Sequence, residues 1–142
     1  MRRKIKILII LLFLFVSFNM EAQQTAQTTM QKLINNQWLI ASNNEKECRL
    51  KHQYTTTQLI ISVICQGKTT SDTADFYLSN QIETTFDYSK VGNVSDGKYI
   101  IFFIPERDGY SYFNVDEIIE LDADFMQLKS LKSNFVFRFY AN

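Results

Sequence analysis

The chain has 142 residues, with 15 Lys and Arg against 15 Asp and Glu, and therefore a formal net charge of zero. A chain of this length is normally one domain. Its basic residues form no stripe with interleaved aromatic residues, which excludes the electrostatic footprint of a nucleic-acid-binding protein.

The first 22 residues have the pattern of a secretory signal peptide. Four basic residues precede an unbroken apolar run over residues 7–16. This run is about half of the roughly 20 residues that a helix needs to cross a bilayer, so we expect cleavage after Ala22 and no transmembrane anchor afterwards. Removal of residues 1–22 leaves eleven basic and fourteen acidic residues, a net charge of about −3. We expect an exported protein, periplasmic or secreted.

The segment that follows has little to bury. Residues 23–32 are rich in Gln, Thr and Ala, which predicts a flexible lead-in. A short helical turn is expected over residues 30–35. The folded domain is predicted to span residues 33–142, and its first strand residues 37–42 (QWLIAS).

The two cysteines of the chain, Cys48 and Cys65, lie at the ends of a predicted hairpin. If Thr56 and Thr57 form its centre, facing residues have numbers that sum to 113, which pairs Cys48 with Cys65. The pair falls at a non-hydrogen-bonded site, where Cα atoms are about 4.5 Å apart and within disulfide range. A four-residue loop over 55–58 keeps the same register. Because disulfides persist in oxidising compartments, we predict a disulfide here, with two free buried cysteines as the alternative.

The rest of the chain has the pattern of short strands separated by turn residues such as NVSDG and PERDG. The expected strands cover residues 72–79, 97–104, 110–115 continuing to 118–121, 125–131 and 134–141. Such a pattern is typical of an antiparallel barrel or sandwich. Eight strands, with the hairpin counted as two, suit a closed barrel, which leaves no exposed edge. We predict an all-β fold: a single antiparallel up-and-down barrel of about eight strands, preceded by a signal peptide and a short helical turn.

Several local sequences support this fold. The first strand carries a Trp after a short helical turn, as Asn36-Gln37-Trp38, and the chain continues through DFYLS, VGNVSDGKYIIF and LDADFMQLKS to a closing aromatic strand. Over residues 33–142 the chain resembles the lipocalin-like domains of small exported Bacteroidetes proteins. The resemblance implies a ligand-binding barrel in which Trp38 is a core residue that closes one end. Asn36 stands where lipocalins carry a glycine.

The resemblance also implies a basic residue near the end of the barrel that stacks on this Trp. Arg138 is the candidate. Phe135, Phe137 and Phe139 share one face of the last strand, because side chains alternate with period two. Arg138 therefore points to the other face unless a bulge intervenes.

Residues with catalytic chemistry are few. His52 is the only histidine and shares the predicted hairpin face of Tyr54 and Leu50, which favours a hydrogen-bonded core or rim position over a general base. No serine lies in a G-x-S-x-G setting. The acidic run over 116–124 lacks the glycine and terminal glutamate of a calcium loop and instead predicts a turn at 121–124. We expect no enzyme activity, no cofactor and no metal site.

One tripeptide resembles a site of covalent modification. Asp72-Thr73-Ala74 resembles the acceptor for O-glycosylation in exported Bacteroidetes proteins. The start of a strand is the alternative explanation of these residues.

Aromatic residues are abundant, with twelve Phe, seven Tyr and one Trp. The strand over 97–104 (GKYIIFFI) is apolar on both faces, which indicates cover on both sides. Either the interior is filled and the outer face is covered by the lead-in or a partner, or the interior keeps a ligand cavity and an exposed patch serves as an interaction surface.

We therefore expect an exported, non-catalytic lipocalin-like protein that binds a small apolar or amphipathic molecule. The candidate lining lies on the more apolar face of each strand: Tyr54, Phe76, Phe102, Phe135 and Phe137. The alternative is a structural or protein-interaction module of the cell envelope, with a solid core and an envelope protein as partner. An open pocket above Trp38 favours the first, and a filled interior favours the second.

Overall fold

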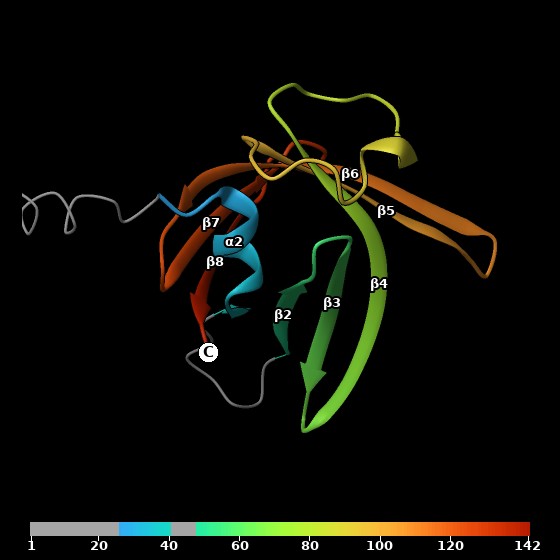
Figure 1. Ribbon diagram of the computed structural model, residues 1–142. Helices are drawn as coiled ribbons and strands as arrows, with labels where there is room; N and C mark the ends of the chain where they lie inside the picture. The colour runs from blue at the N-terminus through green and yellow to red at the C-terminus, as the bar shows by residue number, and fades with distance from the viewer. Residues whose placement is uncertain (1–25, 41–47) are drawn as a thin grey trace, which may run out of the picture.

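The computed structural model describes residues 26–40 and 48–142, apart from the side chain of Arg107. Within them, eight antiparallel strands follow one another around a closed barrel, and the last strand pairs with the first (Figure 1). This confirms the predicted fold class. The elements are α2 (Thr29–Ile34), β1 (Gln37–Ile40), β2 (Arg49–Tyr54), β3 (Gln58–Cys65), β4 (Lys68–Ser79), the 3₁₀ turn η1 (Tyr88–Lys90), β5 (Tyr99–Arg107), β6 (Tyr110–Leu121), β7 (Phe125–Ser130) and β8 (Val136–Ala141). The predicted signal peptide lies outside the described residues.

Helix α2 begins at Thr29, inside the segment that the sequence predicts as a flexible lead-in. Thr28 and Gln31 form a capping box, in which each side chain accepts a hydrogen bond from the backbone of the other residue. The Met30 amide donates to the Ser95 carbonyl at 2.9 Å, and the Thr29 amide donates to the Asp96 carboxylate at 2.8 Å. Long-range bonds of this kind order a segment whose composition alone predicts little structure.

The β2–β3 hairpin has the predicted register. Tyr54 pairs with Leu59 and Arg49 with Ile64, so the facing numbers sum to 113 throughout. The loop is longer than a two-residue turn, because the Gln58 amide donates to the side-chain hydroxyl of Thr55 at 2.9 Å while the Thr55 amide donates to the Gln58 carbonyl. The threonine side chain thus takes the place of a backbone acceptor.

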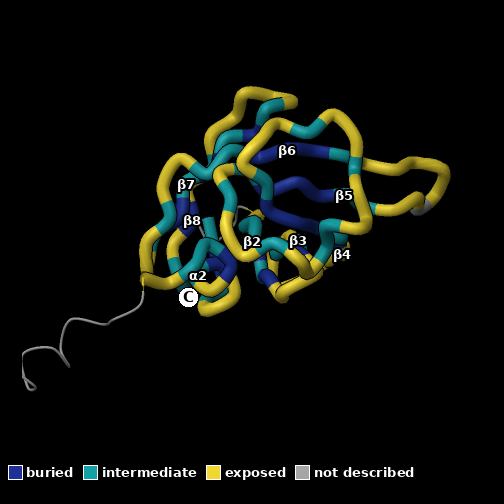
Figure 2. Tube along the Cα trace, turned by 45° about the horizontal axis from the view of Figure 1, so that its top comes forward, coloured by how far each residue is buried: buried dark blue, intermediate teal, exposed yellow. Residues whose placement is uncertain are grey.

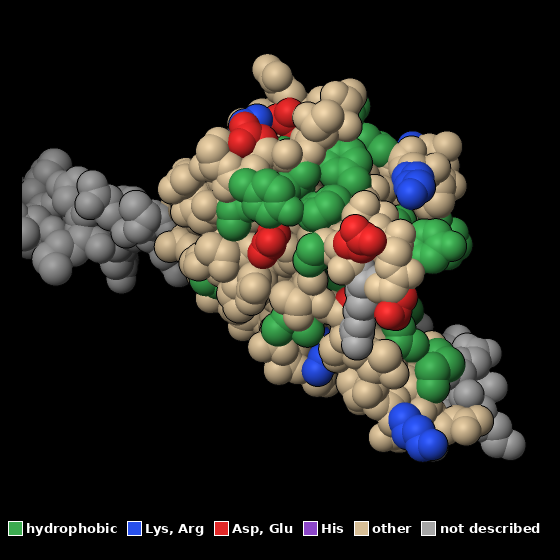
Figure 3. Space-filling view, turned by 90° about the vertical axis from the view of Figure 1, so that its right-hand side faces the viewer, with side chains coloured by type: hydrophobic (Ala, Val, Ile, Leu, Met, Phe, Trp, Pro, Cys, Tyr) green, Lys and Arg blue, Asp and Glu red, His purple; other side chains and the backbone are tan. Residues whose placement is uncertain are grey.

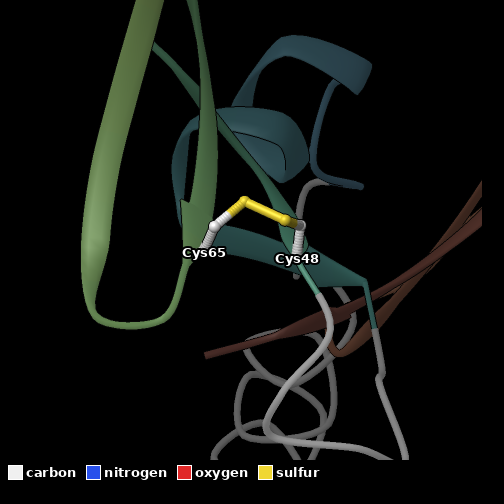
Figure 4. Close-up of a disulfide and its surroundings, with 2 residues drawn as sticks. All are labelled: Cys48 and Cys65. Carbon is white, nitrogen blue, oxygen red and sulfur yellow. A yellow bond between two sulfur atoms is a disulfide. The ribbon is translucent and has the colours of Figure 1, made fainter.

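The predicted disulfide joins Cys48 to Cys65 at the far end of this hairpin (Figure 4). Their Cα atoms are 4.3 Å apart, the short spacing of a non-hydrogen-bonded pair. The turn that follows uses Gln66 and Gly67, both with positive φ, before β4 begins at Lys68. Strand β4 is therefore longer than the predicted segment over 72–79.

The β5–β6 hairpin projects from the barrel and its tip is exposed (Figures 1 and 2). Asp108 and Gly109 form the turn, with φ of 58° and 87°, which is the combination that two-residue hairpins prefer. Strand β6 runs without a break from Tyr110 to Leu121, as expected from the segment over 110–115 that continues to 118–121. Its register with β7 shifts between Ile118 and Glu120.

The main core lies inside the barrel and includes buried side chains from α2 and from seven strands. Buried stretches occupy the middle of the strands, and exposed residues occupy the connections (Figure 2). The buried apolar members are Met30, Leu33, Trp38, Tyr54, Leu59, Ala74, Phe76, Leu78, Ile100, Phe102, Met126, Leu128 and Phe139.

A second, smaller core lies on the outer face of β4, β5 and β6. Tyr77, Ile101 and Val115 are buried there, and Phe86 and Val91 of the β4–β5 connection pack against them. The β4–β5 connection therefore covers the outer face of β5, and neither the lead-in nor a partner is needed to cover it. The Asp87 amide donates to the Tyr77 hydroxyl at 3.3 Å, which ties the connection to the strand beneath it.

Loss of the disulfide should destabilise the barrel. Its two cysteines are separated by 17 residues, and a loop of this size is worth about 3 kcal/mol in the chain-entropy model. We expect the Cys48→Ser, Cys65→Ser double variant to lose stability of that order in urea denaturation. Thiol labelling of the denatured, unreduced protein from its native compartment is the direct check, and two labelled cysteines would contradict the disulfide.

Candidate functional site

The two ends of the barrel differ. At one end α2 closes the interior, because Met30 and Leu33 are buried in the core. The indole N–H of Trp38 donates to the Leu33 carbonyl at 2.9 Å, which holds the helix against β1. Asn36, between α2 and β1, donates through its side-chain amide to the Ala123 carbonyl at 2.7 Å. The β6–β7 turn is thereby attached to the same end.

Inward-facing side chains become exposed at the opposite end. Val63 follows the buried Leu59 on the inner face of β3 and is 41% exposed, and Tyr112 on β6 is 39% exposed. Phe135 lies on the same face as the fully buried Phe139 and is 59% exposed. We call the barrel end formed by Val63, Tyr112 and Phe135 the mouth. Apolar side chains that point inward and still contact solvent are what the entrance of a ligand site requires.

The structure separates the five predicted lining residues into two groups. Tyr54 and Phe76 are buried in the main core with ring centroids 5.4 Å apart. Phe102 is also buried but contacts the ring of Tyr112 at the mouth, with 6.0 Å between centroids. Phe137 is half-buried, and the tilted ring of Phe135 contacts it with 4.8 Å between centroids. The second group, Phe102, Phe135 and Phe137, therefore leads from the core to the mouth.

A polar cluster lies inside the barrel. We define it as His52, Tyr54, Asn114, Asp116 and Ser130, all of which are buried. Nδ1 of His52 is 3.2 Å from the Tyr54 hydroxyl, which confirms a hydrogen-bonded core position for the histidine. The side-chain amide of Asn114 donates to the Asp116 carboxylate at 2.7 Å, and the Ser130 hydroxyl donates to the Asn114 side-chain oxygen at 3.3 Å.

The β6 part of this cluster was not predicted from the sequence. Asp116 belongs to a run of acidic residues for which a turn is predicted at the end. That turn exists, with the Asp122 amide donating to the Phe125 carbonyl at 2.8 Å. The sequence does contain a signal for it: Tyr112, Asn114 and Asp116 are two residues apart in a predicted strand and therefore share one face.

Burial controls the charge states of the polar cluster. Removal from water raises the pKa of Asp116 to about 6, although the hydrogen bond from Asn114 acts in the opposite direction. Burial also lowers the pKa of His52 to about 3, so the imidazole is neutral at physiological pH. The pKa of Tyr54 is raised well above its ordinary value by burial and then by the negative charge of Asp116. Asp116 is thus close enough to Tyr54 for the two to interact across the interior.

Among the lysine and arginine side chains that the structure describes, none forms an ion pair with Asp116. The ion pairs there join Lys90 to Glu83 and Lys98 to Glu117. A buried carboxylate that has only neutral hydrogen-bond partners destabilises a folded protein. Asp116 is therefore a costly residue with no evident benefit to folding.

The outer face offers a second candidate surface. Hydrophobic side chains gather on the side toward which the β5–β6 hairpin projects, with charged side chains between them (Figure 3). Phe86 lies beside Tyr88 and Phe103, with ring centroids 4.9 and 5.6 Å away. A groove of about 470 Å³ also borders the β4–β5 connection, lined by Ile82, Glu83, Phe113, Asn114, Val115, Leu131 and Lys132.

The remaining predicted site residues lie on the outside. Arg138 is exposed on the face of β8 opposite to Phe139, and β8 keeps an unbroken register with β7. No bulge turns Arg138 inward, so its side chain is directed away from Trp38. Thr73 is exposed on β4, where it pairs with Ile60. In the part of the chain that the structure describes, no three His, Cys, Asp or Glu residues gather as metal ligands.

Comparisons with protein-family models, with curated proteins and with solved structures found no match to this chain. Among the described residues, no helix has the length and apolar character needed to cross a membrane.

The pKa shifts in the polar cluster predict how the stability of the protein depends on pH. Asp116 has a folded-state pKa of about 6 against an ordinary 3.8, so the folded state holds the extra proton between these values and its stability falls as pH rises through them. His52 acts oppositely, because its pKa falls from 6.5 to about 3 and stability is lost as pH falls. The two effects offset each other between about pH 4 and 6.

We expect Asp116→Asn to increase the free energy of unfolding near pH 7 by up to about 3 kcal/mol, because about two pKa units are removed at about 1.4 kcal/mol each. On acidification below about pH 6.5 the variant should lose stability steadily, since His52 is then unopposed. Urea denaturation over a pH series measures both effects. Asp124→Asn, an equal charge change in the exposed β6–β7 turn, is the control. A profile for Asp116→Asn that parallels the parent protein would contradict the assignment.

Proposed function

We propose that this chain is an exported, non-catalytic, lipocalin-like protein that binds a small apolar or amphipathic molecule inside its barrel through the mouth. The observation that carries the proposal is the exposure of three inward-facing apolar side chains, Val63, Tyr112 and Phe135, at the end opposite to α2. A closed barrel with one end covered and apolar side chains at the other is an architecture suited to one small ligand.

Two further features support the proposed compartment and the absence of catalysis. The disulfide between Cys48 and Cys65 suits an oxidising environment, and the predicted signal peptide over residues 1–22 would deliver the chain to the periplasm or outside the cell. His52 is neutral, buried and bonded to Tyr54, which suits a structural role better than proton transfer.

The second candidate function is the protein-interaction module of the cell envelope. The observation in its favour is the aromatic group on the outer face, where Tyr88 is 59% exposed beside Phe86 and Phe103. The groove next to it is mostly apolar in its lining residues, including Ile82 and Val115. Exposed apolar patches of this kind often mark interaction sites.

A neutral apolar dye distinguishes the two candidates. We expect Nile red to bind the mature protein, residues 23–142, saturably with one dye per chain and to raise its melting temperature, because a ligand that binds only the folded state stabilises it. Phe135→Ser should weaken dye binding by about fivefold through loss of one aromatic contact at the mouth. Fluorescence titration and thermal melts are the measurements.

Tyr88→Ser is the matched control, since Tyr88 and Phe135 are both 59% exposed and lie on different surfaces. Dye binding that responds to Tyr88→Ser and ignores Phe135→Ser would move the site to the outer face. Absence of dye binding, together with an envelope protein that co-purifies with the parent and is lost with Tyr88→Ser, would replace the ligand-binding proposal with the interaction module.

A further inference from the structure

Asp116 is linked to the mouth through β7 and along its own strand, in spite of its burial. It pairs in register with Ser130, the last residue of β7, and the Ser130 amide donates to the Phe135 carbonyl at 2.9 Å. Asp116 is therefore two strands away from the segment that carries the mouth residue Phe135. Along its own strand, Asn114 and then Tyr112 continue the inner face to the mouth. A ligand that enters at the mouth and follows the inner face of β6 therefore meets Asp116 as the first carboxyl group of that strand.

The surroundings of Asp116 suit a cation. Its described hydrogen-bond partner is the neutral amide of Asn114, and no cationic side chain of the described residues pairs with it. The nearby ionisable groups are phenols, Tyr54 across the interior and Tyr112 toward the mouth, and the charge of Asp116 acts on both. A bound positive charge would offset the cost of this buried negative charge, and a second carboxylate would increase it.

The aromatic rings at the mouth also favour a positively charged group. The ammonium of Lys132 lies over the ring of Tyr112, 4.5 Å from its centroid. This contact places a primary ammonium on an aromatic face at the mouth, where the ring quadrupole attracts it. Beyond Tyr112, Phe102 and the contacting rings of Phe135 and Phe137 offer apolar contacts to the rest of a ligand.

We propose that the barrel selects an amphipathic amine, whose protonated amino group pairs with the Asp116 carboxylate while its apolar part lies along Phe102, Phe137 and Phe135 toward the mouth. The inference rests on the proposed function and specifies its ligand. It excludes fatty acids as preferred ligands, because their carboxylate would face Asp116. Lys132, exposed at the rim, and Lys68, exposed at the start of β4, are described groups near the mouth that would favour an anion, so the test includes a carboxylate.

Three probes with the same alkyl chain test this proposal. Dodecylamine, dodecanol and dodecanoate are each titrated against Nile red bound to the mature protein, near pH 7.5 and below their aggregation concentrations. We expect dodecylamine to displace the dye at a concentration about tenfold lower than dodecanoate does, with dodecanol between them, because a charge-assisted bond is added in one case and a repulsion in the other.

The variants assign the selectivity to Asp116. Asp116→Asn should remove most of the preference for the amine over the alcohol. Asp124→Asn carries the same charge change in the exposed β6–β7 turn and should leave all three probes unchanged. Nile red binding and the thermal melt of each variant report whether the barrel is folded.

A pH series supplies a readout that a structural role would not produce. Displacement by dodecylamine should weaken as pH falls through about 6, where the Asp116 carboxyl gains its proton, and displacement by dodecanol should not. His52 does not contribute in this range because its pKa is about 3, and Tyr54 and Tyr112 stay protonated because their pKa values are raised.

The outcomes separate the two proposals. Dodecanoate that displaces the dye as well as dodecylamine, or an amine preference that survives Asp116→Asn, overturns the selectivity and leaves ligand binding in place. A parent protein that fails to bind Nile red and all three probes overturns the proposed function, and the amine selectivity with it.

Discussion

The structure depends on the pairing of β1 with β8. Strand β1 has only four residues, Gln37–Ile40, and it must bond to β2 on one side and to β8 on the other. Trp38 takes part in both pairings, opposite His52 on β2 and opposite Ala141 on β8. Its indole N–H also donates to the Leu33 carbonyl, so one side chain connects β1 to the helix that closes the barrel end. Without this pairing the sheet would have two open edges, which are prone to association with other chains.

Closure of the barrel brings together polar residues that the chain order keeps apart. Tyr54 comes from β2, Asp116 from β6 and Ser130 from β7, and all three are buried in one interior. Buried polar groups that are satisfied by neutral partners hold a core in one arrangement, but a buried carboxylate still costs free energy. Asp116 pairs with Ile100, which pairs in turn with Leu78, and both of these apolar side chains face the same interior. The free-energy cost of a buried carboxylate among apolar side chains is the main physical reason for connecting Asp116 with a ligand.

The outer layer explains why β5 is apolar on both faces. The β4–β5 connection folds back over Tyr77, Ile101 and Val115 and makes a second core outside the barrel. Gly97 permits this return, because a Cβ at that position would lie 2.7 Å from the Ser79 backbone nitrogen. The exposed ring of Tyr88 is the upper surface of this layer. Aromatic content that is excessive for one narrow core is therefore shared between two cores and the mouth.

Local patterns in the sequence predicted most of the strands and the register of the β2–β3 hairpin. The cysteine pairing follows from this register, since period-two alternation and a short loop determine which residues face each other. Local patterns also predicted that Phe135, Phe137 and Phe139 share a face, and unbroken pairing of β8 keeps Arg138 on the other. In these cases the deciding interactions lie between residues that are near one another in the chain.

Only the tertiary structure decided which faces meet across the barrel. It placed Asp116 near Tyr54, covered Ile101 with Phe86, and ordered α2 through bonds from Thr29 and Met30 to Asp96 and Ser95. It also divided the predicted lining into buried residues and residues at the mouth, because depth in a barrel depends on the stagger of all its strands. The alternation of each strand is a local property of the sequence, whereas the contents of the interior depend on eight strands closing at once.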